Sequence, residues 1–240
     1  MKWEKKKVRV REARWEDLPG IVEVEKKAWP EKLRANRQIY ESRLKIFPEG
    51  VLVAEIEGKI EGVVVTQKVL AEVAKQGRSW NEITDKGRIQ KTHNPEGDTL
   101  YGVNLSVSPF ASRKVATALL ETMGKKAILN NIKQIVLGGR IPGFRRFLEK
   151  YCHQHKLSHL SQKQKDEIAE QYIKAVTSKG KPRDPEINFY TKANMRVTKL
   201  LHNYIEDSES LNYGVLLVWK NPFYNRPLRK LWSWLFKLGQ

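Results

Sequence analysis

The sequence predicts an α+β fold with one mixed sheet, on three observations. Two β-branched runs, 51–56 and 60–69, flank a Glu-Gly-Lys turn, as in a tight antiparallel hairpin. A third strand, 101–107, alternates apolar with polar residues and leads through Pro109 into a helical pattern. Helix and strand signals mix along the chain without strict alternation, which indicates an α+β domain.

A strand near 7–13 and two helices are expected before the hairpin. Apolar residues at helical spacing between 17 and 28 predict the first helix, and the second is expected over 31–46. The stretch 71–98, after the hairpin, is polar and irregular in pattern, so no regular element is predicted there.

Helices and one buried strand follow the strand 101–107. Ser112 is available as N-cap of the first helix, whose apolar residues recur at helical spacing as far as Ile128. The apolar run 132–137 predicts a buried strand that ends at a glycine-rich turn. Two charged helices are expected near 144–157 and 161–178.

A short helix and two strands complete the predicted fold. Asp184 is placed to cap this helix, and Pro185 suits its first position because the proline nitrogen needs no hydrogen-bond acceptor there. The strands are expected near 196–201 and 213–219. Together these elements give one mixed sheet flanked by helices.

The junction between the strand 101–107 and its helix suits an anion. A helix that starts directly after a turn points free backbone N–H groups and the positive end of its dipole at one place, as a bound pyrophosphate requires. Arg113 and Lys114 oppose the dipole there unless an anion lies between them and the amides. The alternative is an ordinary strand, turn and helix with solvated charges.

The net charge of +18 predicts attraction to polyanions, a class that includes coenzyme A, nucleic acid and anionic lipid. Nucleic-acid binding is the minor alternative, because no helix-turn-helix, zinc-finger or RNA-recognition signature is present. Cys152 is the only cysteine, so we expect a reducing cytoplasm, no internal disulfide and no metal. The lysine-rich start lacks a secretory pattern, and no segment approaches the roughly 20 apolar residues of a membrane span.

The order of elements, with REARWEDLPGIVEVEKKAW near the start, LSVSP before a helix and NFYTKANM before the last two strands, resembles the GNAT superfamily of acyl-CoA-dependent N-acetyltransferases. The resemblance covers nearly the whole chain and implies a mostly antiparallel mixed sheet. More narrowly, LYGVNLSVSP, GGRIPGF, DPEINF and DSESLNYGVLLVWKNPFY resemble a GNAT subgroup also found fused ahead of nitrilase-type amidohydrolases, here in stand-alone form. We expect a GNAT-like domain over 1–223 and a basic amphipathic helix in 224–240.

The resemblance implies a site for acetyl-CoA. The strand 101–107 would splay from the strand 132–138, and pantetheine would lie between them and pair with backbone groups of Leu105 and Val107. The residues implied at the cosubstrate are Leu105, Ser106, Val107, Arg113, Lys114, Val115, Ala116 and Thr117.

The phosphate turn departs from the family pattern, which carries glycines. Ser112, Val115 and Thr117 stand at the three pattern positions, and the alternative alignment, one residue shorter, also lacks glycine. Glycine lets backbone approach phosphate closely, so its absence weakens the prediction of coenzyme binding. We hypothesise that Arg113 and Lys114 compensate through charge.

The resemblance also implies catalytic residues. Tyr190 in NFYTKANM falls where many GNAT enzymes carry the tyrosine that protonates the departing thiolate; an aromatic residue packed on the sheet is the alternative. The strand before the phosphate turn lacks the carboxylate base of many relatives, so a water relay through Asn104, Tyr101 or backbone carbonyls remains. Arg140 and His93 are the candidates for binding the acceptor; hydrogen bonds to turn carbonyls and simple exposure are their structural alternatives.

Two segments lie outside the common pattern. About forty residues, 141–183, form a helical insertion where GNAT proteins usually pass quickly to the tyrosine helix, and it would shape substrate choice or build a homodimer surface. The tail 226–238 has the composition of an interfacial membrane helix, and packing on its own domain or on a partner subunit is the alternative. The residues expected on its apolar face are Leu228, Leu231, Trp232, Leu235 and Leu238.

We therefore expect a cytoplasmic enzyme, peripheral to the membrane if its tail meets lipid. It would transfer an acetyl group from acetyl-CoA to a primary amine, a small molecule or a peptide, by direct attack. The alternative is a non-catalytic GNAT-fold module that docks a partner protein, an anionic membrane surface or RNA. The absent glycines and missing carboxylate favour the module, whereas Tyr190 and the overall pattern favour the enzyme.

Overall fold

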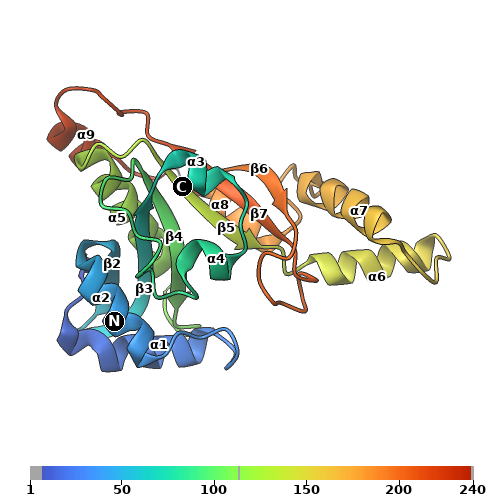
Figure 1. The fold of residues 1–240 in the computed structure, drawn as a ribbon, viewed down its shortest axis with the longest axis horizontal. Coiled ribbons are helices and arrows are strands. Elements are labelled where there is room, and N and C mark those ends of the chain that lie inside the picture. The colour runs from blue at the N-terminus through green and yellow to red at the C-terminus, as the bar shows by residue number, and fades with distance from the viewer. Residues whose placement is uncertain (1–6, 113, 239–240) are drawn as a thin grey trace, which may run out of the picture.

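Seven strands form one sheet in the order β1-β2-β3-β4-β5-β7-β6, with helices on both faces (Figure 1). The structure, a computed structural model, describes residues 7–112 and 114–238. The predicted α+β class with a mixed, mostly antiparallel sheet is confirmed. The strands are β1 (Arg9–Glu12), β2 (Val51–Ile56), β3 (Lys59–Val69), β4 (Thr99–Val107), β5 (Gln134–Arg140), β6 (Arg196–Leu201) and β7 (Gly214–Lys220).

The strands β4 and β5 are the one parallel pair in the described sheet, and they pair over a short length. Their register runs from Thr99 opposite Gln134 to Gly102 opposite Leu137. Beyond that point β4 pairs with β3 alone, with a bulge that leaves Val103 without a partner residue on β3. The two strands therefore diverge near the middle of the sheet, as the resemblance implied.

One face of the sheet is covered by four helices. They are α1 (Leu18–Ala28), α2 (Arg37–Ile46), α3 (Ala71–Lys75) and α4 (Trp80–Thr84). The predicted second helix, 31–46, is wrong in its first six residues, because the Asn36 side chain accepts a hydrogen bond from the Ile39 N–H and starts the helix at Arg37. The prediction of no regular element over 71–98 is also wrong, since α3 and α4 each form a short helix there.

The other face is covered mainly by α5 (Lys114–Leu129), with α8 (Pro185–Lys192) beside β5 and β6. Alternation along β2 divides the core between the faces: Leu52 and Ala54 belong to the cluster under α5, and Val51 and Val53 to the cluster under α1 and α2. Side chains can therefore reach the gap between β4 and β5 from either face of the sheet, from the α5 side or from the α1 side.

The insertion forms two helices, α6 (Phe144–Gln154) and α7 (Gln162–Lys174), which project from one end of the molecule (Figure 1). Both end several residues before their predicted ends. The Tyr213 hydroxyl, just before β7, donates a hydrogen bond of 2.6 Å to Asp166 of α7. The insertion is thereby fixed to the sheet.

The C-terminal helix α9 (Arg229–Leu235) is shorter than the predicted amphipathic segment and lies along α5 (Figure 1). Phe236 packs edge to face on Trp219 of β7 at 5.5 Å between ring centroids, and Trp232 stacks on Phe223 at 5.0 Å. The Ser233 hydroxyl donates a hydrogen bond of 3.0 Å to the carbonyl of Lys125. The tail is therefore docked on the domain.

Candidate functional site

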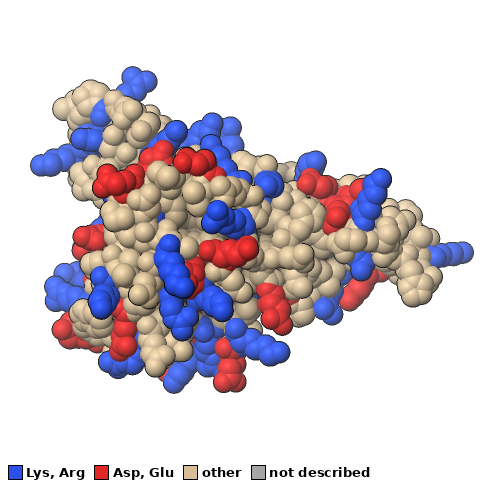
Figure 2. All heavy atoms as spheres, viewed as in Figure 1, with Lys and Arg blue, Asp and Glu red and all other residues tan. Residues whose placement is uncertain are grey.

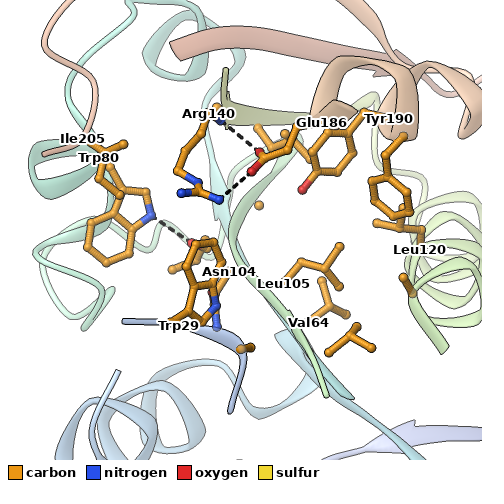
Figure 3. Close-up of a pocket in the computed structure, with 18 of the residues that line it drawn as sticks. Trp29, Val64, Trp80, Asn104, Leu105, Leu120, Arg140, Glu186, Tyr190 and Ile205 are labelled. Atoms are coloured by element: carbon orange, nitrogen blue, oxygen red, sulfur yellow. Dashed lines mark hydrogen bonds and ion pairs between the residues drawn. The ribbon is translucent and has the colours of Figure 1, made fainter. Parts of the chain in front are cut away.

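A cavity of about 410 Å³ opens where β4 and β5 diverge. Its walls come from the loop after α1, the strands β4 and β5, and the helices α5 and α8 (Figure 3). The polar and aromatic side chains on its wall are Trp29, Trp80, Asn104, Arg140, Glu186, Phe189, Tyr190 and Tyr204. The cavity therefore lies where the resemblance implied an acyl-CoA site.

Glu186 and Tyr190 reach the cavity from one face of α8. Asp184 caps this helix as predicted, because its carboxylate accepts from the N–H groups of Glu186 and Ile187 at 2.9 and 3.1 Å, with Pro185 at the first position. Residues four apart on a helix lie one above the other, so the carboxylate and the phenol line the same wall. The Tyr190 hydroxyl points into the open space (Figure 3).

Arg140 and Glu186 form an ion pair at the upper wall (Figure 3). The guanidinium Nη2 lies 2.9 Å from Glu186 Oε1, and the Arg140 backbone N–H donates to Glu186 Oε2 at 3.1 Å. A second carboxylate, Asp207, lies 3.5 Å from Arg140 Nη1. Two carboxylates thus face one cation. Arg140 was predicted to bind an acidic group of the acceptor, and in the structure its charge is already paired with Glu186 and Asp207.

The pKa values of the α8 groups are shifted by their surroundings. Burial raises the pKa of Glu186 to about 7, against the opposing effect of the Arg140 charge. Burial, with the nearby Glu186 charge, also raises the pKa of Tyr190, so the phenol holds its proton. A carboxyl group that ionises near neutral pH and a protonated phenol are the groups that acid–base chemistry needs.

Aromatic side chains flank the polar wall. The Arg140 guanidinium lies 4.8 Å from the centre of a Trp29 ring, a cation–π arrangement. The Trp80 indole N–H donates a hydrogen bond of 2.9 Å to the carbonyl of Val103, the bulged residue of β4 (Figure 3). The Trp80 hydrogen bond thus ties the bulge of β4 to α4, on the α1 side of the sheet.

A buried carboxylate lies behind this part of β4. Glu25 of α1 is 1% exposed and accepts hydrogen bonds from the Tyr40 hydroxyl, the Asn104 amide and the Ser106 hydroxyl at 2.8, 2.6 and 2.5 Å. Its other oxygen accepts from the Ala35 N–H at 3.0 Å. Burial raises the pKa of Tyr40, so its hydroxyl remains a donor to this carboxylate.

Asn104 and Ser106 therefore hold β4 to α1. The Asn104 amide nitrogen is bonded to Glu25, Tyr40 and Ser106, although the residue also lines the cavity. The Ser106 hydroxyl accepts from the Trp29 indole N–H at 2.7 Å as well as donating to Glu25. The predicted catalytic role of Asn104 stays a prediction. The predicted cosubstrate role of Ser106 also stays a prediction, and it concerns the Ser106 backbone because the hydroxyl is already hydrogen-bonded to Trp29 and Glu25.

The predicted phosphate turn is described except at Arg113, which lies outside the described residues. The Ser112 side chain accepts from the Lys114 N–H at 3.3 Å, so it acts at the start of α5 as expected. Lys114 and Thr117 are exposed, and Ala116 lines the cavity. The Val115 side chain is fully buried in the core, so only its backbone could meet a phosphate.

Leu105 and Val107 line the cavity on β4, beyond the last residue paired with β5. His93 lies apart from the cavity wall. Its Nδ1 accepts from the Lys68 N–H at 3.2 Å, and its ring stacks on Phe47 at 4.6 Å. The structure thus shows His93 packed away from this cavity, and its expected role at the acceptor stays a prediction.

Sequence analysis did not single out Trp29, Trp80, Glu186 and Tyr204 on the cavity wall, or Glu25 behind β4. The four-residue spacing of Glu186 and Tyr190 is a signal that the sequence does contain. The burial of Glu25 has no such signal, because it depends on contacts with α2 and β4 that only the fold creates.

A wide groove of about 1220 Å³ borders the cavity, and Leu33 lies on the wall of both. The loop before α2, the start of α7 and the loop before β7 form its sides. The insertion therefore contributes to the surface next to the cavity, through residues such as Gln162 and Asp166.

Over the described ranges 7–112 and 114–238, the structure gathers no group of three His, Cys, Asp or Glu residues that could hold a metal ion. In those same ranges, no helix combines the length and apolar character that crossing a bilayer requires.

Comparison of structures defines the class of protein. The fold matches that of GphF, a GNAT-like decarboxylase solved in complex with isobutyryl-CoA, with a TM-score of 0.72 and 26% sequence identity. The match covers 89% of this chain and 99% of that one. The fold, with its open space between β4 and β5, is thus that of the GNAT proteins.

Comparison of sequences defines the family. The chain is 35% identical over 199 residues to the uncharacterized N-acetyltransferase YkwB of Bacillus subtilis, covering 82% of this chain and 80% of that protein. It is also 29% identical over 221 residues to the probable hydrolase YhcX of the same organism, of which it spans 40%. No family model matches the chain. The chain belongs to the N-acetyltransferases of the GNAT superfamily, and the protein is an enzyme of the acetyltransferase class.

Proposed function

We propose that the protein transfers an acetyl group from acetyl-CoA to a primary amine by direct attack. The observation that carries this proposal is the pair of groups on α8, a carboxyl whose pKa is about 7 and a protonated phenol, on one wall of the cavity. An amine must lose a proton before it attacks a thioester, and the departing thiolate must gain one. The pair supplies both functions.

In the proposed reaction, Glu186 takes a proton from the substrate ammonium group. The free amine attacks the thioester carbonyl, the carbon–sulfur bond breaks, and Tyr190 gives its proton to the sulfur. The second proton lost by the nitrogen returns to Tyr190 through solvent, so the products are the acetamide and CoA. Arg140 keeps Glu186 oriented through the ion pair.

We place the pantetheine arm between β4 and β5, along the part of β4 that carries Leu105 and Val107. The pyrophosphate would lie at the start of α5, where Arg113, Lys114 and Thr117 follow the turn. Ala116, a small residue in the first turn of α5, lines the cavity there. The complex of GphF with isobutyryl-CoA supports an acyl-CoA as the cosubstrate.

We place the amine beside Trp29 and Arg140. The two carboxylates around one guanidinium leave this wall acidic, which favours a cationic amine over an acidic one. The groove beyond Leu33 has room for an acceptor larger than a simple amine, including a peptide. Small amines and peptides are therefore both to be screened.

Calorimetric titration with acetyl-CoA and with CoA, at near-physiological salt, tests the cosubstrate. We expect micromolar binding that the Arg113→Glu/Lys114→Glu variant loses. The control variant Arg88→Glu/Lys91→Glu makes the same charge change at exposed residues away from the cavity and should bind normally. If the native protein binds neither ligand, the proposal that acetyl-CoA is the cosubstrate fails.

A second candidate activity is decarboxylation of a malonyl-type thioester. It is favoured by the 26% sequence identity to GphF, a GNAT-like decarboxylase. Incubation with malonyl-CoA, followed by measurement of CO₂ and acetyl-CoA, tests it. Product formation without any amine would establish decarboxylation, and intact malonyl-CoA would exclude this substrate.

A further inference from the structure

The outer surface of α9 is apolar although the helix is docked on the domain. Trp232 and Phe236 face the body of the protein, where they contact Phe223 and Trp219. The side chains of Leu231, Trp234 and Leu235 point away from it and are 44%, 75% and 51% exposed. Leu228, just before the helix, is 67% exposed. The helix thus has apolar residues on two sides, and the domain uses one of them.

Basic residues surround this exposed surface, which we call the α9 outer face and define as Leu228, Leu231, Trp234 and Leu235. Arg226, Arg229, Lys230 and Lys237 lie around it, all exposed, and the stretch 226–238 contains no acidic residue. In Figure 2 the tan surface at the upper left, at the position of α9 in Figure 1, carries several blue groups.

This combination fits an anionic lipid surface. Tryptophan and leucine enter the boundary between headgroups and acyl chains, while lysine and arginine bind anionic headgroups. The net charge of +18 adds attraction between the whole protein and an anionic membrane. An apolar protein partner would need the leucines and tryptophan but would have no use for uncompensated cations around them.

We propose that the α9 outer face docks the protein on an anionic membrane surface, with the helix lying in the plane of the interface. Docking on α5 and β7 holds the face in one orientation, so lipid binding does not require the tail to fold first. The proposal is independent of acetyl transfer, because none of the four residues lines the cavity.

Flotation of the full-length protein with vesicles tests the proposal. We expect binding to vesicles of phosphatidylcholine with phosphatidylglycerol and none to vesicles of phosphatidylcholine alone. Trp234→Ser/Leu235→Ser should reduce the bound fraction at least tenfold, as should Arg229→Glu/Lys230→Glu. Trp15→Ser is the matched control, since Trp15 is also exposed, at 52%, and belongs to the 3-10 turn just before α1 rather than to α9. All these side chains are exposed, and circular dichroism checks that the variants are folded.

Three outcomes overturn the proposal. The native protein fails to bind the anionic vesicles; the Trp234→Ser/Leu235→Ser variant binds as well as native protein, which assigns binding to the general positive charge; or sedimentation shows a dimer that this variant converts to monomer, which makes a second copy the occupant of the face.

Discussion

Glu186 and Tyr190 lie one helical turn apart on α8, and both line the cavity between the diverging strands. The helix start at Asp184 and Pro185 sets their rotation about the helix axis. One short helix therefore presents both a proton acceptor and a proton donor to the same space. Movement of α8 would displace both groups together.

Replacing Tyr190 with phenylalanine tests the proton donor. Tyr190→Phe removes the hydroxyl and keeps the ring, so kcat should fall on the order of 10²-fold while the dissociation constant of acetyl-CoA stays unchanged. Steady-state kinetics and calorimetry measure the two quantities. Unchanged kcat would remove Tyr190 from the mechanism.

The pH dependence of kcat/KM tests the proton acceptor. Glu186 is protonated below its pKa of about 7, so activity should rise with pH through that value and level off above it. Glu186→Gln should lower kcat/KM on the order of 10²-fold and abolish this rise. A variant that keeps both the activity and the rise would assign the base elsewhere.

The same carboxyl group couples stability to pH. Its pKa is raised in the folded protein from an ordinary 4.5 to about 7, so the folded state binds its proton more tightly than the unfolded state. This group contributes its full stabilisation below about pH 4.5, and the contribution is lost as the pH rises through about 7. Urea unfolding of native protein and of Glu186→Gln over this range should show a smaller decline in the variant.

Removing the buried carboxylate of α1 should destabilise the fold. Glu25→Ala leaves the hydroxyl and amide groups of Tyr40, Asn104 and Ser106 without their acceptor, at a cost of about 3 kcal/mol or more in the free energy of unfolding. Urea unfolding measures this cost. Glu23→Ala is the control on the same helix, since Glu23 is exposed and pairs with Lys27, and it should cost less than about 1 kcal/mol. Equal costs would contradict the role given to Glu25.

The sheet was largely predictable because its strands carry their own signal. The β-branched alternation of β2 and β3, and the Glu-Gly-Lys turn between them, depend on neighbouring residues alone. The start of α2 was predicted six residues early because an amphipathic pattern does not show where a side chain will cap. The short helices α3 and α4 were missed because five residues hold too little periodicity to detect.

The site was predictable where one segment carried it and not where several segments meet. Tyr190, Asn104 and Arg140 were chosen from sequence, and all three line the cavity. Glu25 lies in a run of charged residues that has the pattern of a solvated helix face. Its burial results from the packing of α1 against α2 and β4, which involves residues up to Ser106, far along the chain.

The short pairing of β4 with β5 has a mechanical consequence. Four residue pairs of β4 and β5 join the half-sheet of β1 to β4 to the half-sheet of β5, β7 and β6. Beyond Gly102, a ligand that hydrogen-bonds to the backbone of both β4 and β5 would extend the pairing between the half-sheets, as an added strand would. A bound ligand of this kind would thus add a backbone link between two half-sheets that the apolar core under α5 already joins.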